Sequence, residues 1–291
     1  MYFRVINLFV FQIYLTVLPC YCFVYINKLL TDDLRQTEVY YNNRIFVGYN
    51  KDMKLPKFAD LILFEDDDII VVNKPPFISS LDEREGGEVN MLRLAKGYSA
   101  DAQICHRLDK ETSGALIIAK NPEAYRNISI QFEKRRVKKV YHAIIDGTHV
   151  FENLMIDLPI LNVGKGNVTI SRQEGKRAET WFQSLKYFKH YTLVECRPVT
   201  GRMHQIRIHL ATQRASIAGD EMYKGQPVFL SKIKRKYHLG KDQEEQPIMK
   251  RFALHAYEVS FKLMNGNPIT IHAPYPKDFD TLLKLLEKFD L

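Results

Sequence analysis

The chain has 291 residues, of which 46% are hydrophobic and 26% charged, and its mean hydropathy is −0.25. That composition excludes an intrinsically disordered chain, and the sequence has no repeat of fixed period that would indicate a repeat array. Lysine and arginine outnumber aspartate and glutamate by 42 to 34, which gives a net charge of +8 and an isoelectric point near 9.1. A positive excess of this size favours a polyanionic partner.

The cysteines do not form a metal-binding pattern. No two of the four cysteines are spaced as C-x-x-C; they are Cys20, Cys22, Cys105 and Cys196. Structural zinc sites need clustered thiolates or imidazoles. We therefore expect reduced thiols and no metal ion.

The N-terminus is strongly apolar from residue 5 to residue 26. The length would permit a membrane span or a secretory signal, although two polar residues and a proline interrupt the run. A start downstream at Met53 is a third explanation. We divide the chain into an apolar leader at 1–30, a linker at 31–54 and a folded domain at 55–291.

The folded domain opens with alternating signals for strands and helices. IIVVNK (69–74) predicts a strand that follows an acidic turn at 66–68. A short helix is expected at Val89–Lys96, ended by Gly97. ALIIAK (115–120) is typical of a buried strand.

A second helix has a clear beginning at Asn121. Asparagine is a good N-cap, Pro122 suits the first helical position, and Ala124, Ile128 and Phe132 recur every four residues. We expect this helix to bury one face.

The second half of the domain is dominated by strands joined by short connections. This pattern predicts an α+β fold with a mixed, mostly antiparallel sheet and packed helices. The expected strands are 140–147, 178–188, 191–199, 252–263 and 268–274, and the expected helices are 203–213 and 279–289.

Three polar motifs carry the chemistry. HRLDKETSG (106–114) places His106, Arg107 and Asp109 within four positions. A carboxylate beside cations stays ionised, as a nucleophile or a general base requires. Taken alone, however, this motif is more simply a surface turn.

The second motif is TGRMHQIRIHLA (200–211), which carries Arg202, His204 and Arg207. Residues three apart share one helical face, so His204 and Arg207 would offer a guanidinium to a carboxylate or cations to phosphates. The third motif, KKVYHAIIDG (138–147), carries Tyr141, which could stack on a nucleobase. Each motif alone also fits an ordinary basic helix or strand.

In this order the motifs strongly resemble the RluA family of RNA pseudouridine synthases. IIVVNKPPFI looks like the family's first motif, and GDEMYKG (219–225) and LHAYEVSF (254–261) complete the series. The resemblance runs from Leu61 to Pro274. It implies the pseudouridine synthase fold and the isomerisation of uridine in ribosomal or transfer RNA, without cofactor or metal.

The resemblance also implies roles for individual residues. Asp109 would be the catalytic aspartate, Tyr141 would stack on the target base, and Arg207 would pair with Asp109. Arg107 would occupy the space that the flipped nucleotide leaves. Leu254 would form an apolar wall of the pocket, and the remaining substrate-binding residues would be His106, Arg202 and His204.

One departure from many relatives is the lack of a recognisable S4-type RNA-binding domain before the catalytic domain. We therefore expect the catalytic domain to bind the RNA stem-loop itself, with the basic segments 133–139 and 231–241. The alternative is that these segments are ordinary solvated surface with no role in binding. A cytoplasmic monomer with no obligatory protein partner is expected.

Three rival functions remain open. The first is a non-catalytic RNA-binding or ribosome-assembly protein on the same fold, which would have no need of Asp109, Tyr141 and Arg207 together. The second is a glycoside or nucleoside hydrolase, which would need two carboxylates across the scissile bond. The third is a membrane-tethered form of the synthase, held by the leader at 1–30.

Overall fold

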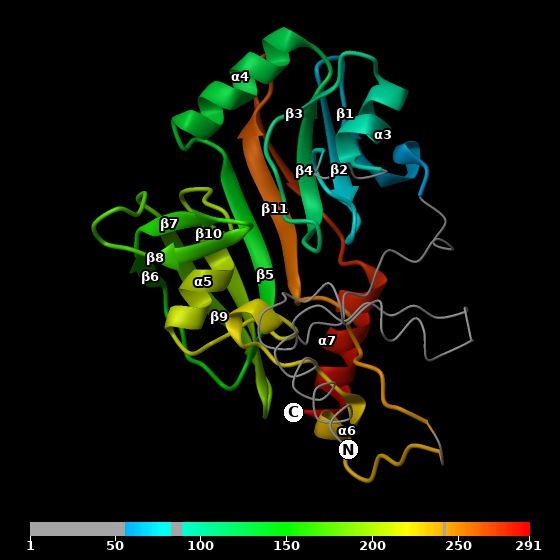
Figure 1. The fold of residues 1–291 in the computed structure, drawn as a ribbon. Helices are drawn as coiled ribbons and strands as arrows, with labels where there is room; N and C mark the ends of the chain where they lie inside the picture. Colours follow the sequence, from blue (N-terminus) through cyan, green and yellow to red (C-terminus); the bar gives the residue numbers. More distant parts are fainter. Residues whose placement is uncertain (1–55, 83–88, 241–242) are drawn as a thin grey trace, which may run out of the picture. The chain divides into compact units, whose positions relative to one another are not determined.

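In the computed structural model the domain is built around one ten-stranded sheet (Figure 1). The structure describes residues 56–82, 89–240 and 243–291, which belong to the unit Lys54–Leu291. The predicted leader at 1–30 and linker at 31–54 lie outside the described residues. No helix among the described residues is long and apolar enough to cross a membrane.

The sheet has the order β1-β2-β4-β11-β5-β10-β9-β6, with β3 paired to β4 and β12 paired to β11. Within the described residues all its pairs are antiparallel except β4 with β11. The predicted mixed, mostly antiparallel α+β fold is therefore confirmed. The strands are β1 (Ile62–Glu65), β2 (Ile69–Lys74), β3 (Gln103–Ile104), β4 (Ser113–Ala119), β5 (Lys138–Asp146), β6 (Leu154–Asp157), β9 (Glu179–Tyr187), β10 (Tyr191–Pro198), β11 (Leu254–Lys262) and β12 (Pro268–His272).

The centre of the sheet opens between β4 and β11. These strands pair only at their first residues, Ser113 with His255 and Gly114 with Ala256. Beyond that point β3 covers the free edge of β4 and β12 covers that of β11. Gly114 makes the close approach possible, because it has φ 117° and a Cβ there would lie 2.2 Å from the carbonyl oxygen of Ala256.

The helices flank the sheet, and a small separate hairpin stands beside it. The helical segments are η1 (Phe58–Leu61), α3 (Met91–Tyr98), α4 (Pro122–Glu133), α5 (Gln205–Thr212), η2 (Glu221–Tyr223), α6 (Leu230–Ile233) and α7 (Lys277–Phe289). The hairpin consists of β7 (Ile160–Gly164) and β8 (Asn167–Ile170). Sequence patterns did not predict this hairpin, although its Gly-Lys-Gly turn is a recognisable signal.

Helix α4 matches its prediction closely. The Asn121 side chain accepts a hydrogen bond of 2.8 Å from the Ala124 amide, and Ala124 and Ile128 are buried. Helix α3 differs, because Gly97 lies within it rather than ending it, and the Ser99 amide bonds to the Ala95 carbonyl. A Cβ at Gly97 would meet nothing within 4 Å, so the glycine is tolerated there without breaking the helix.

Apolar clusters on both faces of the sheet hold these elements in place. Along β2, Ile70 and Val72 pack with α3 on one face, and Ile69 and Val71 pack with α4 on the other. This burial on both faces explains the continuous apolar run of β2. The largest cluster joins β5 and β10 with Phe279, Leu282 and Leu286 of α7. The polar loops at the β4–β11 junction are thereby fixed on a packed support.

Candidate active site

The loop between β3 and β4 carries Asp109, and backbone-directed hydrogen bonds hold it at several points. The Ser80 hydroxyl donates to the Leu108 carbonyl and accepts from the Leu108 amide, at 2.9 and 3.0 Å. The Thr112 amide donates to the Asp109 carbonyl at 3.0 Å, which closes a turn. Leu108 is itself buried. Asp109 therefore stands on a loop with little freedom.

The carboxylate of Asp109 faces two side chains from the second motif. Its Oδ2 lies 3.6 Å from Nη1 of Arg207 and 3.9 Å from Nε2 of His204. The Asp109 side chain is 25% exposed, whereas that of Arg207 is only 6% exposed. The structure thus places a partly accessible carboxylate against a buried cation, which stabilises the negative charge.

Arg207 makes its shortest contacts with a different carboxylate. Its Nε and Nη2 donate to the two oxygens of Asp220 at 2.7 and 2.8 Å, a bidentate pair. The guanidinium also lies over the rings of Phe252 and Tyr223, 4.3 and 5.0 Å from their centroids. Burial disfavours the charged guanidinium, but the bonds to Asp220 outweigh it and the pKa of Arg207 is raised. Arg207 therefore stays charged and fixed in orientation.

His204 completes this side of the site. It has φ 53°, a left-handed conformation directly before α5, and its Nδ1 lies 3.0 Å from the hydroxyl of Tyr223. Burial and the nearby Arg207 lower the pKa of His204, against the opposing effect of Asp109. Burial raises the pKa of Tyr223 to about 12. A neutral imidazole and a neutral phenol therefore line the space beside Asp109.

The expected helix at 203–213 begins at Gln205 instead of Met203. No side chain caps it at His204; Gln205 organises the turn instead, because its Oε1 accepts from Thr200 Oγ1 at 2.7 Å and from the Arg202 amide at 3.0 Å. Its Nε2 donates to the Glu179 carbonyl at 2.9 Å. Gly201 in this turn is exposed to solvent. This network directs Arg207 from the first turn of α5 toward Asp109.

Tyr141 and Leu254 lie on the two strands next to the loop. Tyr141 on β5 pairs with Ala256 of β11 and with Cys196 of β10, and its ring contacts two apolar clusters. Burial raises the pKa of Tyr141, and the Asp109 charge adds to the effect. The phenol is thus neutral and half-buried. Leu254 begins β11 and is 3% exposed.

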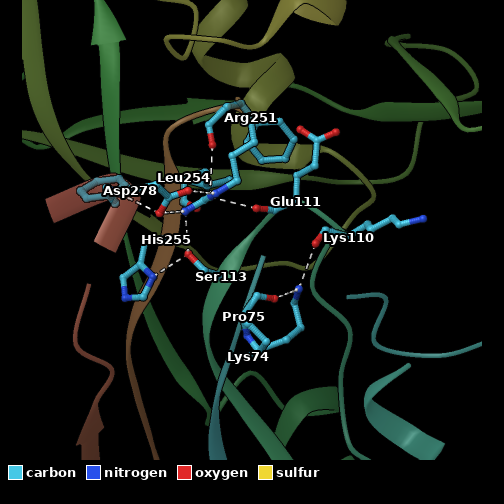
Figure 2. Close-up of polar contacts among 11 residues, drawn as sticks. Lys74, Pro75, Lys110, Glu111, Ser113, Arg251, Leu254, His255 and Asp278 are labelled. Carbon is cyan, nitrogen blue, oxygen red and sulfur yellow. Dashed lines mark hydrogen bonds and ion pairs between the residues drawn. The ribbon is translucent and has the colours of Figure 1, made fainter. Parts of the chain in front are cut away.

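A buried lysine supports the loop from one side (Figure 2). Lys74 at the end of β2 is fully buried, and its Nζ donates to the carbonyls of Pro75, Ile78 and Lys110 at 2.9, 2.8 and 3.1 Å. Three acceptors match the three hydrogens of an ammonium group. Burial lowers the pKa of Lys74 to about 7, with a further contribution from Arg251. The residue directly after Asp109 is therefore fixed through its carbonyl.

A buried arginine supports the loop from the other side, as Figure 2 shows. Nη1 of Arg251 donates to the Glu111 carbonyl at 2.9 Å, and Nη2 donates to Ser113 Oγ at 3.2 Å. Nε donates to Asp278 in the first turn of α7 at 2.7 Å. Ser113 Oγ also lies 2.9 Å from Nδ1 of His255. Arg251 thereby joins the Asp109 loop, β11 and α7.

The structure separates the predicted substrate-binding residues into two groups. His204 and Leu254 lie beside the loop, as described above. Arg107 is exposed, and Arg202 is exposed with its Nε donating to the Arg177 carbonyl at 3.1 Å. His106 is set apart, since its Nε2 accepts the Ile117 amide at 3.1 Å and its ring packs on Phe132. Burial lowers the pKa of His106 to about 3.

Four supporting residues were missed by sequence reasoning: Lys74, Glu111, Asp220 and Arg251. Burial raises the pKa of Glu111 despite the nearby charge of Arg207. Asp220 had a signal in the segment GDEMYKG, whereas Arg251 stands in a basic stretch that resembles surface. Among the described residues no group of three or more His, Cys, Asp or Glu side chains could hold a metal ion.

Comparison with known proteins identifies the class. Residues 68–212 match the family described as RNA pseudouridylate synthase. The chain is 34% identical over 235 residues to an uncharacterised RNA pseudouridine synthase of Zymomonas mobilis, a match that covers 78% of this chain and 99% of the relative. The chain therefore belongs to this family of RNA-modifying isomerases, and the resemblance seen in its motifs is confirmed.

Other relatives are longer. Over 175 residues the chain is 34% identical to ribosomal large subunit pseudouridine synthase C of Vibrio cholerae, which covers 58% of this chain and 56% of that relative. Among solved structures, human RNA pseudouridylate synthase domain containing 4 superimposes with a TM-score of 0.59 at 24% identity, covering 79% of this chain and 94% of that one. At that identity the likeness shows the fold.

Proposed function

We propose that this protein converts uridine to pseudouridine in RNA with Asp109 as the catalytic carboxylate. The observation that carries the proposal is the position of the Asp109 carboxylate, partly exposed and 3.6 Å from the buried Arg207. A carboxylate oriented by a fixed cation suits attack at a sugar carbon or removal of a sugar proton. Both routes begin once the nucleotide is flipped out of its stack.

The residues around Asp109 would bind the flipped base and the RNA stack from which it came. Tyr141 offers a half-buried ring next to Asp109 on which the uracil can stack, and Leu254 adds apolar surface. The base must be retained while the glycosidic bond is broken and C5 is joined to C1′. Arg107, exposed two residues before Asp109, would fill the space left in the RNA stack.

The substrate that we propose to test first is large-subunit ribosomal RNA. The support is the name of the Vibrio cholerae relative, a ribosomal large subunit pseudouridine synthase. Transfer RNA is the second candidate. The exposed cations of 133–139 and 231–240 suit either polyanion.

The proposal is tested by tritium release from RNA that carries C5-tritiated uridine, because C5 loses its hydrogen when it bonds to the sugar. The wild type should release tritium, and Asp109→Asn should reduce the rate at least about a thousandfold. Asp101→Asn is the matched control, since Asp101 is an exposed aspartate in the turn before β3, and it should retain full activity. Folded wild type without release from either RNA class would overturn the proposal in favour of an RNA-binding protein.

A further inference from the structure

The turn from Asp220 to Gln226 contacts Arg207 on one side and lines a surface hollow on the other. Asp220 and Tyr223 contact Arg207, as described above. The Gly225 amide donates to the Asp220 carbonyl at 2.8 Å, and the Gly219 amide donates to the Gln226 carbonyl at 2.8 Å, which closes the turn on itself. Lys224 and Gln226 are turned to a surface hollow instead. The hollow therefore begins on the same short turn that fixes Arg207.

The turn is held rigidly against its neighbours. A Cβ at Gly225 would lie 1.9 Å from the carbonyl oxygen of Ile217, so backbone packs on backbone there. The Gln226 amide donates to Asp146 at the end of β5 at 2.9 Å. The side of the hollow that Lys224 and Gln226 form is thus held next to the residues that contact Arg207.

Several lysine and arginine side chains line the hollow. Its first part has a volume of about 520 Å³ and includes Lys224, Lys232 and His190. A second part of about 330 Å³ shares Lys232 and His190 and adds the cationic side chains of Lys189, Lys234 and Arg235. We call the two parts together the basic hollow. Five lysine and arginine side chains line it, from three segments of the chain.

Two carboxylates also border the basic hollow, and both are engaged by the protein. The Asp290 side chain is 1% exposed and accepts from the His190 amide at 2.9 Å and lies 2.5 Å from its Nδ1. Asp146 accepts the Gln226 amide, and burial raises its pKa while Lys232 opposes that shift. Burial also raises the pKa of the neighbouring Tyr191 to about 12. The exposed charge of the basic hollow is therefore positive.

We propose that the basic hollow binds backbone phosphates of the RNA substrate outside the flipped nucleotide. The proposal rests on the proposed function and deepens it, because it gives the RNA a second anchoring point next to the turn that fixes Arg207. Lysine side chains on exposed positions suit phosphates as point charges, and each neutralised phosphate releases bound counterions. Contacts to phosphates set the register of the RNA without reading its sequence.

The test compares two variants that remove equal charge. The first is Lys224→Asn, Lys232→Ala, Arg235→Ala, with asparagine chosen because position 224 has φ 69°. The matched control is Lys57→Ala, Lys96→Ala, Lys262→Ala, which removes three exposed lysines from elements that do not line the basic hollow. Both are made in the Asp109→Asn background, so that the RNA stays unmodified during the measurement.

The measurement is the dissociation constant for in vitro transcribed bacterial large-subunit ribosomal RNA over a series of salt concentrations. The slope of log K against log salt is negative, and each lost phosphate contact reduces its magnitude by about 0.7 to 0.9. The basic-hollow variant should therefore reduce the magnitude of the slope by about two to three, and the control by less than about one. Lys232→Glu, a single exposed change, should lower it in the same direction.

Each outcome separates the two proposals. If the basic-hollow variant and the control change the slope equally, or neither changes it, the basic hollow does not bind phosphates, whatever the wild type does in the tritium assay. If the magnitude of the slope falls as expected but the protein with native Asp109 releases no tritium, the proposed function fails and the phosphate site stands. Absence of RNA binding by the wild-type protein would overturn both.

Discussion

The two sides of the site are fixed in different ways. On one side, Lys74 and Arg251 hold the Asp109 loop through backbone carbonyls, at Lys110 and Glu111. On the other side, Asp220 holds Arg207 through its side chain, with two bonds of 2.7 and 2.8 Å. The carboxylate is therefore placed by its backbone and the guanidinium by a partner carboxylate.

The difference predicts which substitutions should disturb Asp109 and which should disturb Arg207. Contacts to the loop backbone leave the Asp109 side chain available for chemistry, because no hydrogen bond from the described residues occupies its oxygens. A bidentate partner leaves only Nη1 of Arg207 to face Asp109, at 3.6 Å. Substitution of Lys74 or Arg251 should shift the position of Asp109 and leave its carboxylate intact. Loss of the Asp220 carboxylate should leave the buried charge of Arg207 without its bidentate partner.

The largest effect is expected for Asp220→Asn. The substitution leaves the buried charge of Arg207 without its bidentate partner, which should lower the free energy of unfolding by about 3–5 kcal/mol. Urea unfolding followed by circular dichroism measures this. A loss below about 1 kcal/mol would mean that Asp109 alone can balance Arg207.

Next in size is Arg251→Lys. Lysine keeps the charge but cannot reach Asp278, Glu111 and Ser113 together, so we expect a loss of about 2–3 kcal/mol in the free energy of unfolding. The single-turnover rate constant should also fall while RNA affinity is retained. Asp280→Asn on the same helix is the control: it breaks only the exposed pair with Lys284 and should cost less than about 0.5 kcal/mol.

Lys74→Met should give a smaller effect that depends on pH. The pKa of Lys74 is lowered from 10.5 to about 7, so between those values the unfolded chain binds more protons than the folded protein. Stability of the wild type should therefore rise with pH through this window, by up to about 2 kcal/mol from pH 7 to 9. The variant should lack this rise. Thermal unfolding of both proteins across the window measures it, and parallel curves would show that Lys74 stays charged.

The smallest effect on stability is expected for Tyr141→Phe, which keeps the ring and removes a hydroxyl that forms no hydrogen bond with the residues that the structure describes. Stability should change by less than about 1 kcal/mol. If the phenol takes part in proton transfer, the single-turnover rate should fall about a hundredfold with RNA affinity unchanged. Tyr141→Leu, which also removes the ring, should weaken RNA binding as well. Equal rates for wild type and Tyr141→Phe would leave Tyr141 with stacking alone.

Local signals predicted most of the fold. The cap and apolar face of α4, the run of β2 and the hairpin of β9 and β10 each follow from neighbouring residues, and the structure reproduces them. The order of the strands in the sheet did not follow from local patterns. The pairing of β4 with β11 joins Ser113 to His255, which no local pattern specifies.

Part of the candidate site could be named from the sequence, and it stays a prediction. Residues in contiguous motifs, such as Asp109 and Arg207, could be named because the motif carries them. Arg251 reads as a surface cation in Met249-Lys250-Arg251, yet it is 2% exposed. Only the tertiary fold brings the Glu111 carbonyl, Ser113 and Asp278 to it. Burial of a cation is decided by such distant partners, and a single sequence does not display them.

The parallel pairing of β4 with β11 also has a consequence for the order in which the protein folds. Ser113 and His255 are 142 residues apart, and Arg251 lies 140 residues from Glu111. Closing so long a loop costs entropy before any contact is gained, so these contacts should form late. On the ribosome the Asp109 loop would leave the exit tunnel well before the strand and helix that fix it. The nascent chain would then carry the proposed catalytic loop without its supports until β11 and α7 have been synthesised.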